Sequence, residues 1–143
     1  MDLLPQFPIV DGPYRMTPEW TVTTPVPMNR RFEDKMLVLW RPGLTAWITV
    51  WGSDEHESQQ ARLAWIKEVA SKEAFDRKEL RRDNMIYYSY RLLEPANDKR
   101  LPALYCFAVG ATGHVQVALY FNHEADAKTA ESICHSICED HEP

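Results

Sequence analysis

The stretch that most constrains the fold runs from residue 36 to residue 51, MLVLWRPGLTAWITVW, and it holds three of the five tryptophans. Two runs rich in β-forming residues flank Pro42-Gly43, a combination that predicts a β-hairpin. Alternation gives the second run two faces, with Trp47, Thr49 and Trp51 on one and Ala46, Ile48 and Val50 on the other. Because neither face is strongly polar, we expect other layers to cover this strand on both sides.

Two segments have the apolar spacing of amphipathic helices, which would supply those layers. The first spans residues 55–70, with Gly52-Ser53-Asp54 as the break and capping segment before it, and its apolar positions are Ala61, Ala64, Trp65, Ile66 and Val69. It is expected to run for roughly 15 residues. The second begins after the capping residue Asn122, and its apolar stripe consists of Ala130, Ile133, Cys134, Ile137 and Cys138.

The remaining β-patterned segments complete a sheet. A short strand at 21–24 is expected to end at Pro25 and Pro27, and 29–35 has the composition of a turn. Residues 75–82 suit either a solvated helix end or, as we favour, a charged edge strand that turns at Asp83-Asn84. Strands are also predicted at 85–93, 103–109 and 114–121, the last two joined around Gly110-Gly113. Residues 1–19 read as an irregular arm and 139–143 as a frayed tail of a single domain, 1–143.

These patterns predict an α+β fold, a mainly antiparallel sheet of about six strands with helices packed on it in an αβα sandwich. A formal net charge of -5, with basic residues dispersed among acidic neighbours, argues against nucleic-acid binding. No stretch approaches the ~20 apolar residues of a membrane-spanning helix. The N-terminus does not resemble an export signal, and the three cysteines are most simply reduced thiols, so a cytoplasmic location is expected.

The candidate metal ligands are Cys134, His135 and Cys138 with His141, because residues four apart face the same way on a helix. The same cysteines complete an apolar helix stripe, where buried cysteine acts as a small hydrophobe. With no second ligand pair elsewhere, we expect no metal site and no cofactor.

Catalytic residues are not indicated either. Cys106 and His114 lie on one predicted hairpin, but a four-residue loop would place Cys106 opposite Val117, too far from the imidazole for a nucleophile and base pair. The histidines lack metalloprotease spacing, and no nucleophile elbow or phosphate loop occurs. We therefore expect a protein that is not an enzyme.

Aromatic residues are the remaining candidates for function. Trp40, Trp47, Trp51, Tyr87, Tyr88 and Tyr90 are the predicted partner-binding residues, since tryptophan and tyrosine are common in binding hot spots. The competing interpretation is that they fill the core of a covered sheet. A third is that they line an apolar pocket for a small ligand.

Taken along its length, the chain resembles small bacterial proteins of the PsbP/DcrB-like fold. The matching features are the Thr17-Pro18-Glu19-Trp20 entry to a strand, the hairpin at 36–51, the helix at 55–70, the strands from 76 to 121 and the closing helix after Asn122. Such proteins are generally non-catalytic. Some are periplasmic lipoproteins or photosystem accessory proteins, and others are immunity proteins or effector adaptors of type VI secretion.

The absence of a lipobox cysteine separates this chain from the lipoprotein members. The resemblance therefore implies a cytoplasmic immunity protein or effector adaptor, whose partner is a toxin or a secreted effector, with no contact to nucleic acid or membrane. A homodimer is compatible with such a role. The alternative function is a small-ligand carrier with an aromatic pocket.

Overall fold

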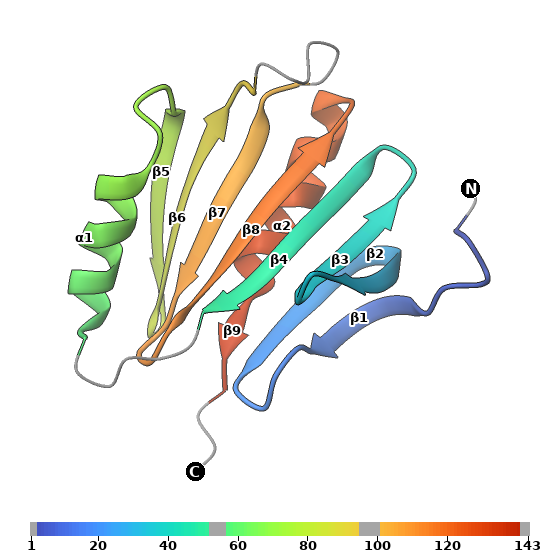
Figure 1. The fold of residues 1–143 in the computed structure, drawn as a ribbon, viewed down its shortest axis with the longest axis horizontal. Helices are drawn as coiled ribbons and strands as arrows, with labels where there is room; N and C mark the ends of the chain where they lie inside the picture. Colours follow the sequence, from blue (N-terminus) through green and yellow to red (C-terminus); the bar gives the residue numbers. More distant parts are fainter. Residues whose placement is uncertain (1–2, 52–56, 95–100, 141–143) are drawn as a thin grey trace.

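One open antiparallel sheet of nine strands organises the part of the chain that the structure describes (Figure 1). The computed structural model describes residues 3–51, 57–94 and 101–140. The strands are β1 Ile9–Arg15, β2 Trp20–Glu33, β3 Met36–Arg41, β4 Leu44–Trp51, β5 Phe75–Arg82, β6 Met85–Leu92, β7 Ala103–Val109, β8 His114–Phe121 and β9 Cys138–Glu139. Their order across the sheet is β1-β2-β3-β4-β8-β7-β6-β5, and β9 pairs with β2 outside this path.

The predicted α+β class with an αβα sandwich of about six strands is wrong. Strands make up 54% of the described residues and helices only 19%, so the fold is closer to all-β. Two α-helices are present in the described ranges, α1 Gln59–Val69 and α2 Ala127–Ser136, with a 3₁₀ turn at Glu124–Asp126 before α2. Neither helix is long and apolar enough to cross a membrane, and no other described segment is such a helix.

The number of strands was underestimated mainly at the N-terminus, where prolines argued against two strands that form in the structure. β1 forms within the predicted irregular arm and lies at the edge of the sheet. Pro13 has no N–H to donate, and an edge strand tolerates this loss because one of its sides pairs with no other strand. β2 continues through Pro25 and Pro27, which lie where the register with β1 shifts and before pairing with β3 begins at Asn29. Only Asp34 and Lys35 form the turn predicted for 29–35, with φ values of 49° and 67°.

The two predicted hairpins and the charged edge strand are confirmed. β3 and β4 meet at Gly43, whose φ of 82° suits glycine, and β7 and β8 meet where Gly110 N donates to Gly113 O at 2.9 Å. β5 is the last strand of the sheet and is exposed along its length, and it turns into β6 at Asp83, which has a φ of 56°.

α1 packs on the face of β6 and β7 that carries Tyr88 and Phe107, through Leu63 and Ile66. Its N-cap is Ser58, whose hydroxyl accepts from Ala61 N at 3.0 Å, while the predicted Gly52-Ser53-Asp54 cap lies outside the described residues. The predicted apolar stripe is mostly wrong. Trp65 and Val69 are 49% and 57% exposed, whereas the buried positions are Arg62, Leu63 and Ile66.

α2 packs on the opposite face, behind β4 and β8 in Figure 1. Four residues of the predicted stripe are confirmed, since Ala130, Ile133, Cys134 and Ile137 are all at most 1% exposed. The fifth, Cys138, was predicted wrongly, because it lies beyond α2 in β9 and is only partly buried. Cys134 also forms a disulfide with Cys106 of β7, their Cα atoms 6.1 Å apart. The structure thus differs from the prediction of three reduced thiols. The sequence did not reveal the pair, because the two cysteines meet only when α2 docks on the sheet.

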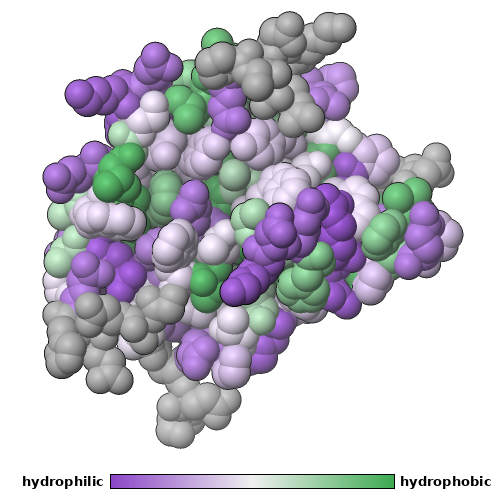
Figure 2. Space-filling view, viewed as in Figure 1, coloured by the Kyte–Doolittle hydropathy of each residue, from purple (hydrophilic) through white to green (hydrophobic). Residues whose placement is uncertain are grey.

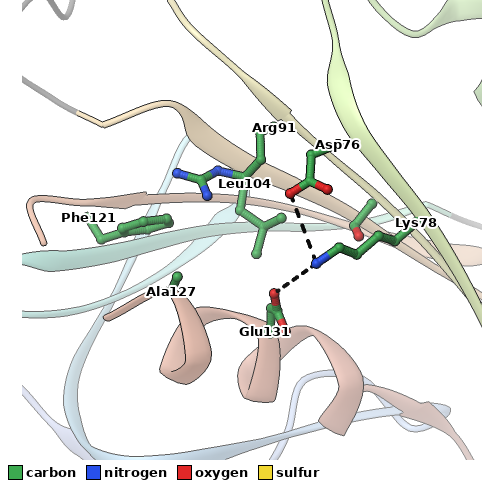
Figure 3. A pocket seen from close by; sticks show the side chains of 8 residues that line it. Asp76, Lys78, Arg91, Leu104, Phe121, Ala127 and Glu131 are labelled. Atoms are coloured by element: carbon green, nitrogen blue, oxygen red, sulfur yellow. Dashed lines mark ion pairs between the residues drawn. The ribbon is translucent and has the colours of Figure 1, made fainter. Parts of the chain in front are cut away.

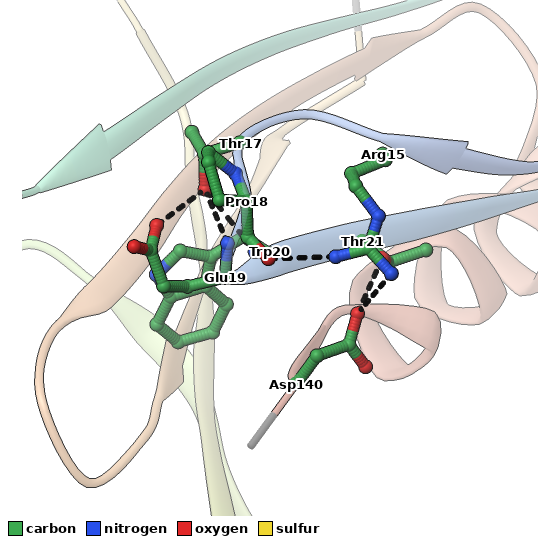
Figure 4. A network of polar contacts seen from close by, with 7 residues as sticks. All are labelled: Arg15, Thr17, Pro18, Glu19, Trp20, Thr21 and Asp140. Carbon is green, nitrogen blue, oxygen red and sulfur yellow. Dashed lines mark hydrogen bonds and ion pairs between the residues drawn. The ribbon is translucent and has the colours of Figure 1, made fainter. Parts of the chain in front are cut away.

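The C-terminal segment is held by polar contacts, so the predicted frayed tail is ordered at 139 and 140. β9 pairs Cys138 with Thr21 of β2, and the next residue, Asp140, accepts from Arg15 at 2.9 Å and from the Thr21 hydroxyl at 3.1 Å (Figure 4). Residues 141–143 lie outside the described ranges.

Candidate functional site

Part of one sheet face has neither of the described helices above it. Leu44, Ala46 and Ile48 of β4 point into the core beneath α2, so the alternate residues of β4 point to the other side. Neither described helix packs over this part of the sheet, and α1 reaches only its border at His114. We call this surface the open face, and its members are Arg31, Trp40, Thr45, Trp47, Thr49, Trp51, Tyr105, Gln116 and Tyr120.

The register of the strands assembles the open face. Trp40 lies opposite Thr45 and Trp47 opposite Ala118, while Thr45 lies opposite Tyr120. In Figure 2 this side of the molecule is a mixture of pale, green and purple patches, without one large hydrophobic area. Tryptophan, tyrosine and threonine have intermediate hydropathy, so an aromatic surface here is compatible with that mixture.

The middle of the open face is built around Arg31. Its guanidinium carbon lies 4.7 Å from the ring centroid of Trp40 and 5.6 Å from that of Trp47. Glu33 fixes the guanidinium by an ion pair of 2.9 Å, and Phe7 packs edge-on against Trp40 at 5.0 Å. Cation-π contacts and packing therefore hold both indoles in a defined position on the sheet.

Trp51 marks one end of the open face and is 46% exposed. Its ring stacks on that of His114 at a centroid distance of 5.9 Å. His114 is 2% exposed, and its Nδ1 lies 3.2 Å from the guanidinium of Arg62, which pairs with Glu57 at 3.1 Å. Burial, and then the charge of Arg62, lowers the pKa of His114 to about 4, so the imidazole is neutral at neutral pH.

Glu94, just after β6, lies at another border of the open face. The Tyr120 hydroxyl donates to its carboxylate at 3.1 Å, and the Tyr105 hydroxyl also bonds to it. The two hydroxyl oxygens are 3.3 Å apart. Burial and the hydrogen bond with Glu94 raise the pKa of Tyr105, so this phenol remains a neutral donor.

The structure separates the six predicted aromatic residues. Trp40, Trp47 and Trp51 share the open face, whereas Tyr87, Tyr88 and Tyr90 are only 2%, 4% and 5% exposed. Tyr88 and Tyr90 lie beneath α1, and Tyr87 lies on the α2 side, where its hydroxyl donates to Ile137 O at 2.7 Å.

Sequence reasoning missed Arg31, Glu94, Tyr105 and Tyr120. The β7–β8 register offered one signal, because pairing Val109 with His114 places Tyr105 opposite Ala118, two residues before Tyr120. Nothing local marked Glu94, which lies between two predicted strands, or Arg31, which lies in the predicted turn at 29–35.

The metal and nucleophile candidates do not assemble into a site among the described residues. No group of three His, Cys, Asp or Glu side chains there has the arrangement of a metal centre, and His141 lies outside the described ranges. Cys106 lies opposite Val117 and His114 opposite Val109, as the register argument predicted. Burial raises the pKa of Cys138, which keeps this thiol protonated.

The cavities along β5 have mixed linings, in which several charged side chains stand beside apolar ones. Lys78 lies between Asp76 and Glu131, at 4.0 and 3.7 Å, in a small pocket between β5 and α2 (Figure 3). A neighbouring groove of about 390 Å³ is lined by Lys78, Glu79, Leu80, Tyr87, Ser89, Glu131 and His135. Such linings give no support to a carrier in which the predicted tyrosines and tryptophans enclose an apolar ligand.

The open face is therefore the candidate site, since it unites aromatic rings, a held guanidinium and a carboxylate on one surface. Comparison with known proteins adds no family to this description: no family model matches the chain, and no curated protein matches it.

Proposed function

We propose that this protein is a non-enzymatic protein-binding domain and that the open face is its binding surface. The observation that carries the proposal is the position of Trp40, Trp47 and Trp51 on one sheet face that neither described helix covers. Tryptophan, tyrosine and arginine dominate binding hot spots, and here all three occur together in fixed positions. A rigid aromatic surface loses little conformational entropy when a partner docks.

Within this class, the resemblance described above favours an immunity protein or an effector adaptor of bacterial type VI secretion. The partner is then a toxin or a secreted effector. The net charge of -5 suits a basic partner, because opposite charges accelerate association.

A comparison of tryptophan variants in an affinity-capture experiment tests the proposed surface. Trp51→Ala removes a ring that is 46% exposed at the open face, and Trp65→Ala removes one that is 49% exposed on α1. A partner captured by wild type and by Trp65→Ala, but about ten-fold less by Trp51→Ala, supports the proposal. Equal capture by all three proteins contradicts it.

Two further measurements separate the roles. Protection of cells that express a toxin from a neighbouring gene favours immunity, and loss of an effector after deletion of this gene favours an adaptor. Light scattering at several protein concentrations tests whether the open face instead binds a second copy of the chain. A homodimer that Trp51→Ala dissociates would assign the open face to self-association and contradict the proposed role for a foreign partner.

We further propose a cytoplasmic location, in which Cys106 and Cys134 would be a reduced pair in the cell and form the disulfide of the structure only on oxidation. A count of thiols tests this. A cytoplasmic protein keeps its cysteines reduced, so protein denatured and alkylated directly in cell lysate should react at all three. Reaction at Cys138 alone would mean that the Cys106–Cys134 disulfide is formed in the cell, and it would place the protein in an oxidising compartment instead.

A further inference from the structure

Among the described residues, the carboxylate of Glu94 has two phenol donors and no cationic partner. Tyr105 and Tyr120 both donate to Glu94, and Tyr120 reaches one of its oxygens at 3.1 Å and the other at 3.5 Å. A carboxylate accepts about four hydrogen bonds, so these phenols leave part of its capacity unused. Glu94 is only partly buried, so a partner group can reach it.

The second carboxylate beside the open face shows what such a group can be. Glu33 pairs with Arg31, whose guanidinium also lies against the rings of Trp40 and Trp47. Among the ion pairs of the described residues, none involves Glu94. Within the part of the chain that the structure describes, the open face thus has two combinations of carboxylate and aromatic rings, and the one at Glu33 holds a guanidinium while the one at Glu94 does not.

We propose that Glu94, Tyr105 and Tyr120 form the subsite of the open face that receives an arginine side chain of the partner protein. A guanidinium bonds to a carboxylate through two parallel N–H groups and stacks on aromatic rings, as Arg31 does beside it. The two tyrosine hydroxyls orient the Glu94 carboxylate before the partner arrives. This assignment rests on the proposed function, because it names the chemistry of that partner.

The test is an NMR titration with N-acetyl-arginine amide, using N-acetyl-citrulline amide as an uncharged probe of the same shape. We expect saturable shifts of the Tyr105 and Tyr120 ring signals with the arginine probe only. Glu94→Gln should weaken that binding about ten-fold, since it removes the charge and keeps the shape. Glu124→Gln is the matched control, because it makes the same charge change at a residue that pairs with Arg91. It should leave binding unchanged.

Equal shifts with both probes, or equal affinity of wild type and Glu94→Gln, would overturn the assignment. If Glu94→Gln does not fold, wild type still decides: an about ten-fold rise in salt concentration should weaken binding of the arginine probe several-fold, and an unchanged affinity rejects an ionic subsite. The titration contains no partner, so it is independent of the capture experiment. Failure here with loss of capture by Trp51→Ala rejects only the arginine subsite, whereas arginine binding with equal capture rejects the proposed function.

Discussion

At the scale of single residues, His114 shows how tertiary packing changes an ordinary side chain. Trp51 stacks on one side of it, and Arg62 from α1 approaches its Nδ1 at 3.2 Å. Water is excluded and a positive charge is close, and both effects oppose a proton on the ring. The imidazole therefore acts as a neutral packing and hydrogen-bonding group at the border of the open face.

The first prediction concerns the pH dependence of stability. The pKa of His114 is lowered from 6.5 to about 4 in the folded state, so on acidification the unfolded chain binds the proton first. The contribution to stability is complete above pH 6.5 and is lost as the pH falls toward 4. Urea unfolding should show that wild type loses on the order of 3 kcal/mol more than His114→Gln over this interval. Parallel pH curves for the two proteins would contradict this.

At the scale of elements, α1 shows why apolar spacing can select the wrong face of a helix. The segment has apolar residues on more than one side, so the periodicity does not choose between Leu63 with Ile66 and Trp65 with Val69. The sheet chooses, because Tyr88 and Phe107 offer an apolar surface to Leu63 and Ile66. Arg62 is buried as well, since Glu57 and His114 satisfy its guanidinium.

The second prediction follows from this choice of face. Leu63 is 3% exposed and Trp65 is 49% exposed, although they are two residues apart on one helix. Leu63→Ala should lower the free energy of unfolding by about 2–5 kcal/mol through loss of burial and the cavity left behind. Trp65→Ala should cost below about 1 kcal/mol, despite the larger side chain removed. Urea denaturation of both variants decides, and the reverse order would show that α1 docks through its other side.

At the scale of the whole molecule, the sheet is one continuous layer that the two helices cover incompletely. α2 and α1 lie over opposite faces and toward different strands, so neither described helix lies over the open face beside α1. One end of the main strand path is β5, which is charged and exposed along its length. This composition discourages pairing with another sheet edge.

The third prediction is the order of amide hydrogen exchange across the sheet. β4 and β8 pair with neighbours on both sides and contain the core residues Ile48, Val117 and Leu119. Their amides should exchange most slowly, through near-global unfolding, while those of β5 should exchange orders of magnitude faster through local opening. Exchange followed by NMR checks this order. Protection of β5 equal to that of β8 would contradict the strand order.

Local sequence was sufficient for features that depend on neighbours along the chain. The hairpins at Gly43 and Gly110-Gly113, the edge strand β5 and the α2 stripe up to Ile137 are confirmed because turn residues and helical or strand periodicity act over a few positions. The same alternation placed Trp47 and Trp51 on one face. Alternation along β6 likewise places Met85 and Tyr87 in one core and Tyr88 and Tyr90 in the other.

Only the tertiary structure decided what covers each face and which distant residues meet. The prolines of β2 suggested a break, yet the change of pairing partner accommodates them. The Cys106–Cys134 disulfide, the contact of Arg62 with His114 and the cluster of Glu94 with Tyr105 and Tyr120 depend on register and helix docking between distant segments. The sequence pattern predicted that Trp47 and Trp51 share a strand face, but only the structure places Trp40 beside them and shows that neither described helix covers them.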